Sequence, residues 1–344
     1  MWSISEVEEA LHIYYQEDYL PSPLDVLLKK PSISKDLTQE QSVYVDKIKS
    51  YIKFNVEDFD KLLFNSESLK KNADTTLKEL KKEPEGNVRK KGTKFTKAFK
   101  KLVQDIEYTR IQKEVYHGNY TKFVGTFAEL CCLEVDFFLS KDDQVVWENL
   151  RGIPRVISTP AIRLLKDGID DVDDEDCYSS VVLVVEVKND YKLTPLRRCL
   201  PRVGIDSDPF SPSNTIGVLR PRRNGDGKKL QDKSNKERNQ IHFEVRLNCN
   251  ILGRHAGELL LDLRKCCKDE EVALLTMPGM IVDGTKVFFT LLEISTKHFK
   301  KLIHNGELDD EDKAVIYYSV PLDILLKEDR DILIENCIRL NNMK

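Results

Sequence analysis

The sequence lacks clustered cysteine and histidine. Its eight cysteines include two adjacent pairs, Cys131-Cys132 and Cys266-Cys267, but no Cys-x-x-Cys pair, and its six histidines are scattered. Structural zinc sites use cysteine and histidine at short, regular spacings, so this distribution argues against a zinc module or a histidine-based triad. We expect the cysteines to be reduced, mostly buried thiols of an intracellular protein.

Long apolar runs and an excess of one charge are also lacking. No window approaches the roughly 18 apolar residues of a membrane span, and the first residues, MWSISEVEEALH, do not form a signal peptide. The 54 basic and 58 acidic side chains leave a net charge of −4, so any nucleic-acid binding must come from local patches. We expect a soluble protein, made in the cytosol and resident in the cytoplasm or nucleus.

The 344 residues are enough for an α/β domain and a second module. Residues 1–115 are predicted to form a helical module, with a capping box at Thr38 and Gln41 and a long helix over residues 88–115. Residues 116–344 are predicted to form an α/β domain with a mixed sheet flanked by helices. Its expected helices cover residues 123–138, 253–267 and 322–342, and its expected strands cover residues 145–147, 161–165, 181–188, 272–277 and 286–294. Residues 192–238, rich in proline and poor in periodicity, are predicted to be a long, partly disordered loop.

The strand predicted at residues 181–188, VVLVVEVK, is the most informative segment. Its run of large aliphatic residues is typical of a fully buried strand. Side chains alternate along a strand, so Glu186 and Lys188 should share one face while Val187 points to the other. An oxygen ligand and a cation would then lie together. A plain salt bridge at a strand end is the alternative interpretation, and exposed pairs of that kind stabilise little.

The order of helix, three strands, helix and strand, with Glu186 and Lys188 ending the third strand, resembles the PD-(D/E)XK nuclease-like, or restriction-endonuclease-like, superfamily. The resemblance covers roughly residues 120–295. It implies a mixed sheet flanked by helices, Mg²⁺ or Mn²⁺ as cofactor, Glu186 as a metal ligand and Lys188 assisting the attacking water. It also implies a supporting acidic residue in the helix at 123–138, which is Glu129.

Two positions depart from that pattern. Where the second strand should carry Pro-Asp, the chain has Pro160-Ala161, and alanine cannot bind a metal. Asp167 or Asp170, in the acidic segment from 167 to 176, are possible replacement ligands, although such a segment is more often solvated. Where the family often has a glutamine, the chain has His255, which is alternatively a helix-surface or core histidine.

Two basic segments are candidate nucleic-acid contacts. Residues 89–101 carry seven basic side chains and no acid, but Phe95 and Phe99 there lie at core spacing, so a solvated helix face is equally compatible. Residues 192–238 carry twelve basic and five acidic side chains, and phosphate binding needs such an excess. The candidate contacts there are Arg197, Arg198, Arg220, Arg222, Arg223, Lys228 and Lys229.

The leading expectation is Mg²⁺-dependent cleavage of nucleic-acid phosphodiesters, with Glu186, Asp170, Asp167 and Glu129 as metal ligands and Lys188 and His255 as further catalytic candidates. The first alternative is a protein of the same fold that lost activity and binds nucleic acid or a protein partner. The second is a helical interaction module carried by a structural α/β platform.

Overall fold

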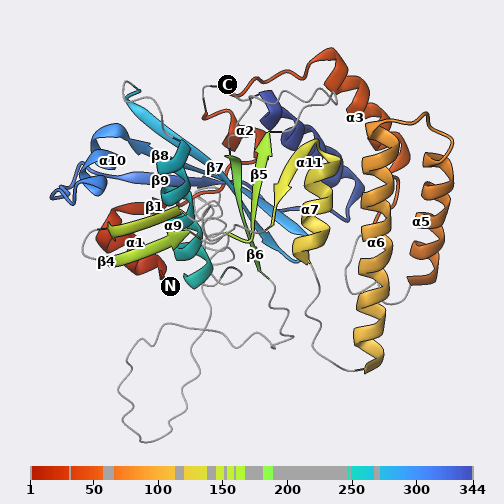
Figure 1. Ribbon diagram of the computed structural model, residues 1–344, viewed down its shortest axis with the longest axis horizontal. Coiled ribbons are helices and arrows are strands. Elements are labelled where there is room, and N and C mark those ends of the chain that lie inside the picture. Colours follow the sequence, from red (N-terminus) through yellow and green to blue (C-terminus); the bar gives the residue numbers. More distant parts are fainter. Residues whose placement is uncertain are drawn as a thin grey trace, which may run out of the picture. The chain divides into compact units, whose positions relative to one another are not determined.

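The computed structural model has the α/β fold expected from the sequence (Figure 1). It describes residues 2–30, 32–56, 66–112, 120–137, 145–150, 153–158, 160–166, 181–188, 247, 249–266 and 272–342. Residues 1–191 and 249–344 belong to one compact unit. Within the described residues, no helix is both long and apolar enough to cross a bilayer.

The main sheet is mixed and has eight strands in the order β1-β9-β8-β7-β6-β5-β2, with β10 paired to β8. The strands are β1 (Ile13–Tyr15), β2 (Leu133–Asp136), β5 (Ile162–Lys166), β6 (Val181–Lys188), β7 (Leu274–Asp283), β8 (Lys286–Ser295), β9 (Ala314–Tyr318) and β10 (Leu322–Asp323). β6 lies between β5, which is antiparallel to it, and β7, which is parallel. A central strand is covered on both faces, which explains the apolar run of β6.

A tight hairpin joins β7 to β8. Asp283 at the end of β7 pairs with Lys286 at the start of β8, so a two-residue turn joins the strands. Gly284 has a φ of 66°, a conformation that glycine adopts at little cost and that tight hairpins require.

The helix predicted over residues 123–138 is wrong in its second half. Helix α7 covers Tyr120–Leu130, and β2 begins at Leu133 to pair with β5. Cys132 adopts a left-handed conformation with a φ of 58°, which ends the helix. The Asn341 side chain donates hydrogen bonds to the carbonyls of Cys131 and Cys132. Asn341 therefore stabilises the turn at Cys131 and Cys132, which the local apolar periodicity does not predict.

The strand predicted near residue 145 exists but does not join the main sheet. β3 (Val145–Leu150) pairs with β4 (Ile153–Ser158) as a separate antiparallel hairpin. The first strand of the main sheet on this side is instead β2, which the prediction had assigned to a helix.

The N-terminal residues are mainly helical, as predicted, but they also contribute to the sheet. The helices are α1 (Ile4–Leu11), α2 (Pro23–Leu27), α3 (Gln39–Tyr51), α5 (Ser66–Leu80) and α6 (Asn87–Gln112). The capping box of Thr38 and Gln41 is confirmed at the start of α3. β1, however, pairs in parallel with β9. The first 115 residues are therefore partly built into the α/β fold.

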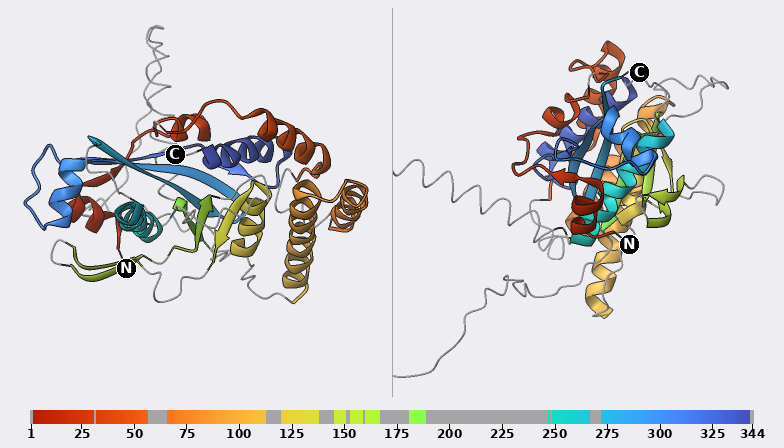
Figure 2. Two further views of the ribbon diagram at one scale, coloured as in Figure 1. Left: turned by 45° about the horizontal axis from the view of Figure 1, so that its top comes forward. Right: turned by 90° about the vertical axis from the view of Figure 1, so that its left-hand side faces the viewer.

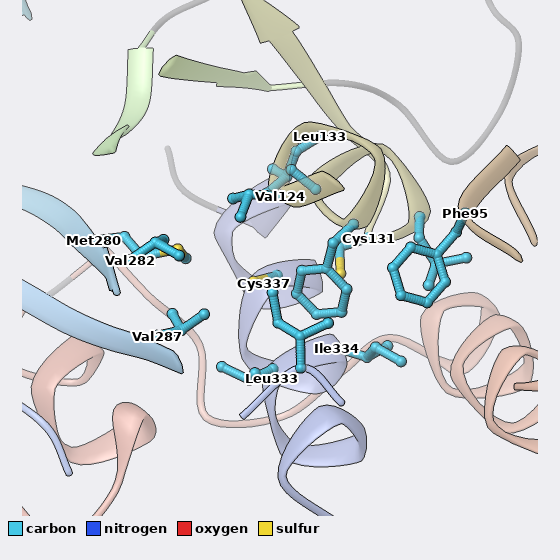
Figure 3. Packing of buried hydrophobic residues seen from close by; sticks show 14 of the residues in the cluster. Phe95, Val124, Cys131, Leu133, Met280, Val282, Val287, Leu333, Ile334 and Cys337 are labelled. Carbon is cyan, nitrogen blue, oxygen red and sulfur yellow. The ribbon is translucent and has the colours of Figure 1, made fainter. Parts of the chain in front are cut away.

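Helices cover both faces of the sheet. Figure 2 shows α9 (Cys249–Cys266) and α11 (Lys327–Arg339) on opposite sides of the strands. Val185 and Val187 belong to the apolar cluster that includes α6, α7 and α11, part of which Figure 3 shows around Cys131 and Cys337. Val184 belongs to the other cluster, which includes α1, α9 and α10 (Thr296–Ile303). The alternation along β6 thus assigns neighbouring residues to different cores.

Candidate functional site

Glu186 is held at the sheet face that α9 covers. It follows Val184 by two residues, so alternation directs both toward α9 and away from the core that contains Val185 and Val187. Glu186 is only 4% exposed. The side chain of Lys188 lies outside the described residues, although its backbone pairs with Asp283 of β7. A buried carboxylate here needs a compensating partner.

Helix α9 supplies that partner and a second carboxylate. Arg254 Nη2 lies 3.3 Å from Glu186 Oε2, and Arg254 Nε donates a hydrogen bond to Glu258 Oε1 at 3.0 Å. Arg254 and Glu258 are four residues apart, which is one helical turn, so both belong to one side of α9. We call Glu186 and Glu258 the acidic pair, and Arg254 is the arginine that contacts both.

The acidic pair is short of positive charge. Two ionised carboxylates and one guanidinium leave a formal charge of −1 in a buried place. Burial raises the pKa of the Glu186 carboxyl group, and this effect exceeds the lowering caused by Arg254 and by a hydrogen bond with Glu258. Burial and then the charge of Glu186 raise the pKa of Glu258. The physical cause is that a low-dielectric site disfavours the charged form of an acid.

One oxygen of each carboxylate lacks a hydrogen-bond donor. Among the described residues, neither Glu186 Oε2 nor Glu258 Oε2 accepts a hydrogen bond, although both atoms are buried. Two ionised carboxylates repel each other, and a proton or a cation relieves that repulsion. The geometry therefore suits a shared proton or a bound cation.

A second buried ion pair lies one helical turn further along α9. Arg163 of β5 donates two hydrogen bonds to Asp262, Nε to Oδ1 at 2.6 Å and Nη2 to Oδ2 at 3.1 Å. Both residues are almost fully buried. Since Arg163 pairs with Val184 of β6, it lies on the same sheet region as Glu186. Asp262 therefore has its own cation, and Arg254 is left to the acidic pair.

His255 lies between α9 and the sheet. Its Nε2 is 2.8 Å from Thr290 Oγ1 of β8, and it is fully buried. Burial lowers its pKa to about 3, so the ring is neutral near pH 7. A β-carbon at Gly279 of β7 would lie 2.8 Å from the ring, so glycine there permits the close packing. This placement agrees with the alternative interpretation of His255 as a core histidine.

Glu129 is not brought to the acidic pair. It lies near the end of α7 and forms an ion pair with Lys94 of α6, with 2.6 Å between Nζ and Oε1. Its neighbours Phe127, Ala128 and Leu130 pack in the cluster on the sheet face away from α9. The neighbours of Glu129 on α7 thus pack on the sheet face opposite the one that α9 covers, and its predicted role as a supporting ligand stays a prediction.

Other predicted residues lie outside the described part of the chain. These are the ligand candidates Asp167 and Asp170 and the basic residues Arg197, Arg198, Arg220, Arg222, Arg223, Lys228 and Lys229. Ala161, in contrast, is described and immediately precedes β5. The register of β5 with β6 begins at Ile162, opposite Val185, and Ala161 packs against the apolar cluster that contains Val185 and Val187. The described residues contain no group of three or more metal-ligating side chains.

The comparisons add no relative to these observations. Comparison of the chain with protein-family models, with curated proteins and with solved structures found no match in any of the three.

The sequence interpretation missed Glu258 and Arg254. A signal was present, because Arg254, Glu258 and Asp262 recur every four residues within a helix that otherwise has many apolar positions, ILGRHAGELLLDL. Charged residues on the side of a helix that faces a core are rare unless they are paired. That spacing indicates partners on the sheet, but it does not identify which strand residues they are.

Proposed function

We propose that this chain is a metal-dependent nuclease-like hydrolase of nucleic-acid phosphodiesters, related in design to the PD-(D/E)XK superfamily. The observation that carries the proposal is Glu186, a buried carboxylate near the end of a central strand, lying against a second carboxylate at a site short of positive charge. The succession α7, β2, β5, β6, α9, β7, interrupted between β2 and β5 by the separate hairpin β3-β4, is compatible with this relationship, and β2, β5, β6 and β7 are adjacent in the sheet.

Each group has a chemical task in this proposal. Glu186 holds Mg²⁺ or Mn²⁺, hard cations that prefer oxygen ligands and retain several waters. When bound, such an ion would lower the pKa of a coordinated water and offset the negative charge that develops on the phosphate. Lys188 assists by orienting the attacking water and stabilising that charge. A nucleic-acid substrate agrees with the expected location in the cytoplasm or nucleus.

A second candidate function is binding without cleavage. Two observations favour it: Ala161 has no side-chain oxygen that could bind a metal, and Arg254 already occupies a position where a metal would bind. In that case the acidic pair is structural, and the basic segment at residues 192–238 supplies the affinity for phosphate. Binding of this kind weakens steeply with salt because counterions are released from the nucleic acid.

A cleavage assay separates the two. Labelled single- and double-stranded DNA and RNA are incubated with the full chain and Mg²⁺ or Mn²⁺, using Glu186→Gln as the test variant and Glu134→Gln, an exposed carboxylate of β2, as the matched control. Cleavage by the wild type and by Glu134→Gln, lost in Glu186→Gln, supports the hydrolase. Salt-dependent binding without cleavage supports the second function. Neither binding nor cleavage rejects both.

A further inference from the structure

We propose that Glu258 of α9 is the second carboxylate ligand of one divalent cation, Mg²⁺ or Mn²⁺, held between it and Glu186. This inference rests on the proposed function and specifies its metal site. Glu258 supplies a side-chain oxygen where the Pro-Asp position of the expected pattern has none, because that position is Ala161 in this chain.

The two carboxylates are already arranged around one positive group. Glu186 and Glu258 contact different nitrogens of the Arg254 guanidinium, at 3.3 and 3.0 Å. Both side chains therefore aim at the same small volume from β6 and from α9. A cation in that volume is within reach of both, and Mg²⁺ needs no more than two carboxylates when water completes its coordination.

Two buried carboxylate oxygens point to a ligand beyond the arginine: Glu186 Oε2 has the ion pair with Arg254 at 3.3 Å but no hydrogen bond, and Glu258 Oε2 accepts no hydrogen bond among the described residues. Glu186 and Glu258 are 4% and 3% exposed, and Oε2 of each is buried without a hydrogen-bond donor among the described residues. Buried carboxylate oxygens are normally satisfied, and a metal ion satisfies them as well as a donor does. Asp262 does not compete for the ion, because Arg163 binds both of its oxygens.

Arg254 can leave when the ion enters. Its side chain is 35% exposed, whereas the two glutamates are almost completely covered. Two carboxylates and one divalent ion are neutral, while the same carboxylates with one guanidinium carry a formal charge of −1. The exchange therefore lets both carboxylates ionise without a net buried charge, and it frees a planar guanidinium that suits a phosphate group of the substrate.

Mn²⁺ binding by the full chain tests this site without any need for activity. Electron paramagnetic resonance measures free Mn²⁺ with the wild type, Glu186→Gln, Glu258→Gln, Arg254→Gln and the control Glu134→Gln. We expect both site glutamines to weaken binding by at least the roughly 10–100-fold that loss of an outer-shell partner costs. Glu134→Gln should bind as the wild type does. Arg254→Gln should bind at least as tightly, because the competing cation is gone.

The outcomes distinguish this inference from the proposed function. Binding that is lost in Glu186→Gln and retained in Glu258→Gln overturns the role of Glu258 and leaves the hydrolase standing. A wild type that binds no Mn²⁺ overturns both. If Glu258→Gln does not fold, as judged by circular dichroism, Arg254→Gln decides: tighter or equal binding supports the exchange, and weaker binding overturns it.

Discussion

Arg163 of β5 and Asp262 of α9 form a bidentate ion pair that is almost completely buried. The pair joins the helix to the strand beside β6 and therefore sets where the rest of α9 lies along the sheet. Arg254 and Glu258 share that side of the helix, and their approach to Glu186 depends on the same placement. The pair is a positioning element for the candidate site.

Breaking this pair should destabilise the protein strongly. We expect Arg163→Met or Asp262→Leu alone to lower the free energy of unfolding by about 3–5 kcal/mol, because each leaves an uncompensated buried charge. The double variant should recover most of the loss. Urea unfolding followed by circular dichroism measures both. A decrease of less than about 1 kcal/mol in the free energy of unfolding of the single variants would show that other groups or water compensate the remaining charge.

His255 should make the protein acid-sensitive. Its pKa is lowered to about 3 in the folded chain, whereas an unperturbed histidine titrates near about 6.5. Below pH 6.5 the unfolded chain binds a proton that the folded chain refuses, so stability falls as pH falls toward 3. At pH 4 this contribution amounts to about 3 kcal/mol.

His255→Gln isolates that effect. The variant has no group that titrates at this position, so its stability relative to the wild type should rise by about 3 kcal/mol between pH 7 and pH 4. Denaturant unfolding at both pH values measures the difference. The same change at His304, which is exposed, serves as the control. Parallel pH profiles of wild type and His255→Gln would contradict a neutral buried imidazole.

Arg330 should be needed to hold α11 against the N-terminal region. Its guanidinium donates to the carbonyls of Ile52, Phe54, Ile324 and Leu325 and lies 4.2 Å from the centre of the Phe54 ring. Leu325 O also accepts from the Val56 N–H, so Arg330→Met leaves the carbonyls of Ile52, Phe54 and Ile324 without this donor, each at about 1–3 kcal/mol, and we expect a total loss of at least about 3 kcal/mol. Arg330→Lys should lose most of this, because an ammonium group lacks the planar fork.

Chemical denaturation measures these losses, with Lys313→Met as the control at an exposed site. An Arg330→Met variant as stable as the control would show that water or a rearranged side chain satisfies the carbonyls. A large loss in Arg330→Met with none in Arg330→Lys would assign the effect to charge and chain length, not to the shape of the guanidinium.

Substitution of Phe99 tests whether its ring in α6 serves core packing or nucleic-acid binding. Its ring stacks on Phe54 with centroids 3.8 Å apart, and it is fully buried. We expect Phe99→Ala to cost about 3–5 kcal/mol of stability and Phe99→Leu clearly less. Neither change should affect nucleic-acid affinity under conditions where the variant is folded. A specific loss of affinity in Phe99→Leu, seen in a filter-binding assay, would show that this ring contacts bases after all.

Several elements were predictable because their signals are local. The capping box of Thr38 and Gln41, the stripe of Phe95 and Phe99 in α6 and the turn at Gly284 involve residues close in the chain. The end of α7 was not predictable in this way. Apolar periodicity runs through residue 138, and only pairing with β5 and the hydrogen bonds from Asn341 make residues 133–136 a strand.

By itself the sequence determined the α/β class, the buried strand β6 and the emergence of Glu186 on one of its faces, because alternation and apolar runs depend on neighbouring residues. Only the tertiary structure decided which charged residues meet Glu186. Glu258 and Arg254 reach it, and Glu129 does not, because α9 packs on the same sheet face as Glu186 and α7 packs on the other. Ion pairs between distant segments depend on the register of that packing, for which a single sequence carries no local signal.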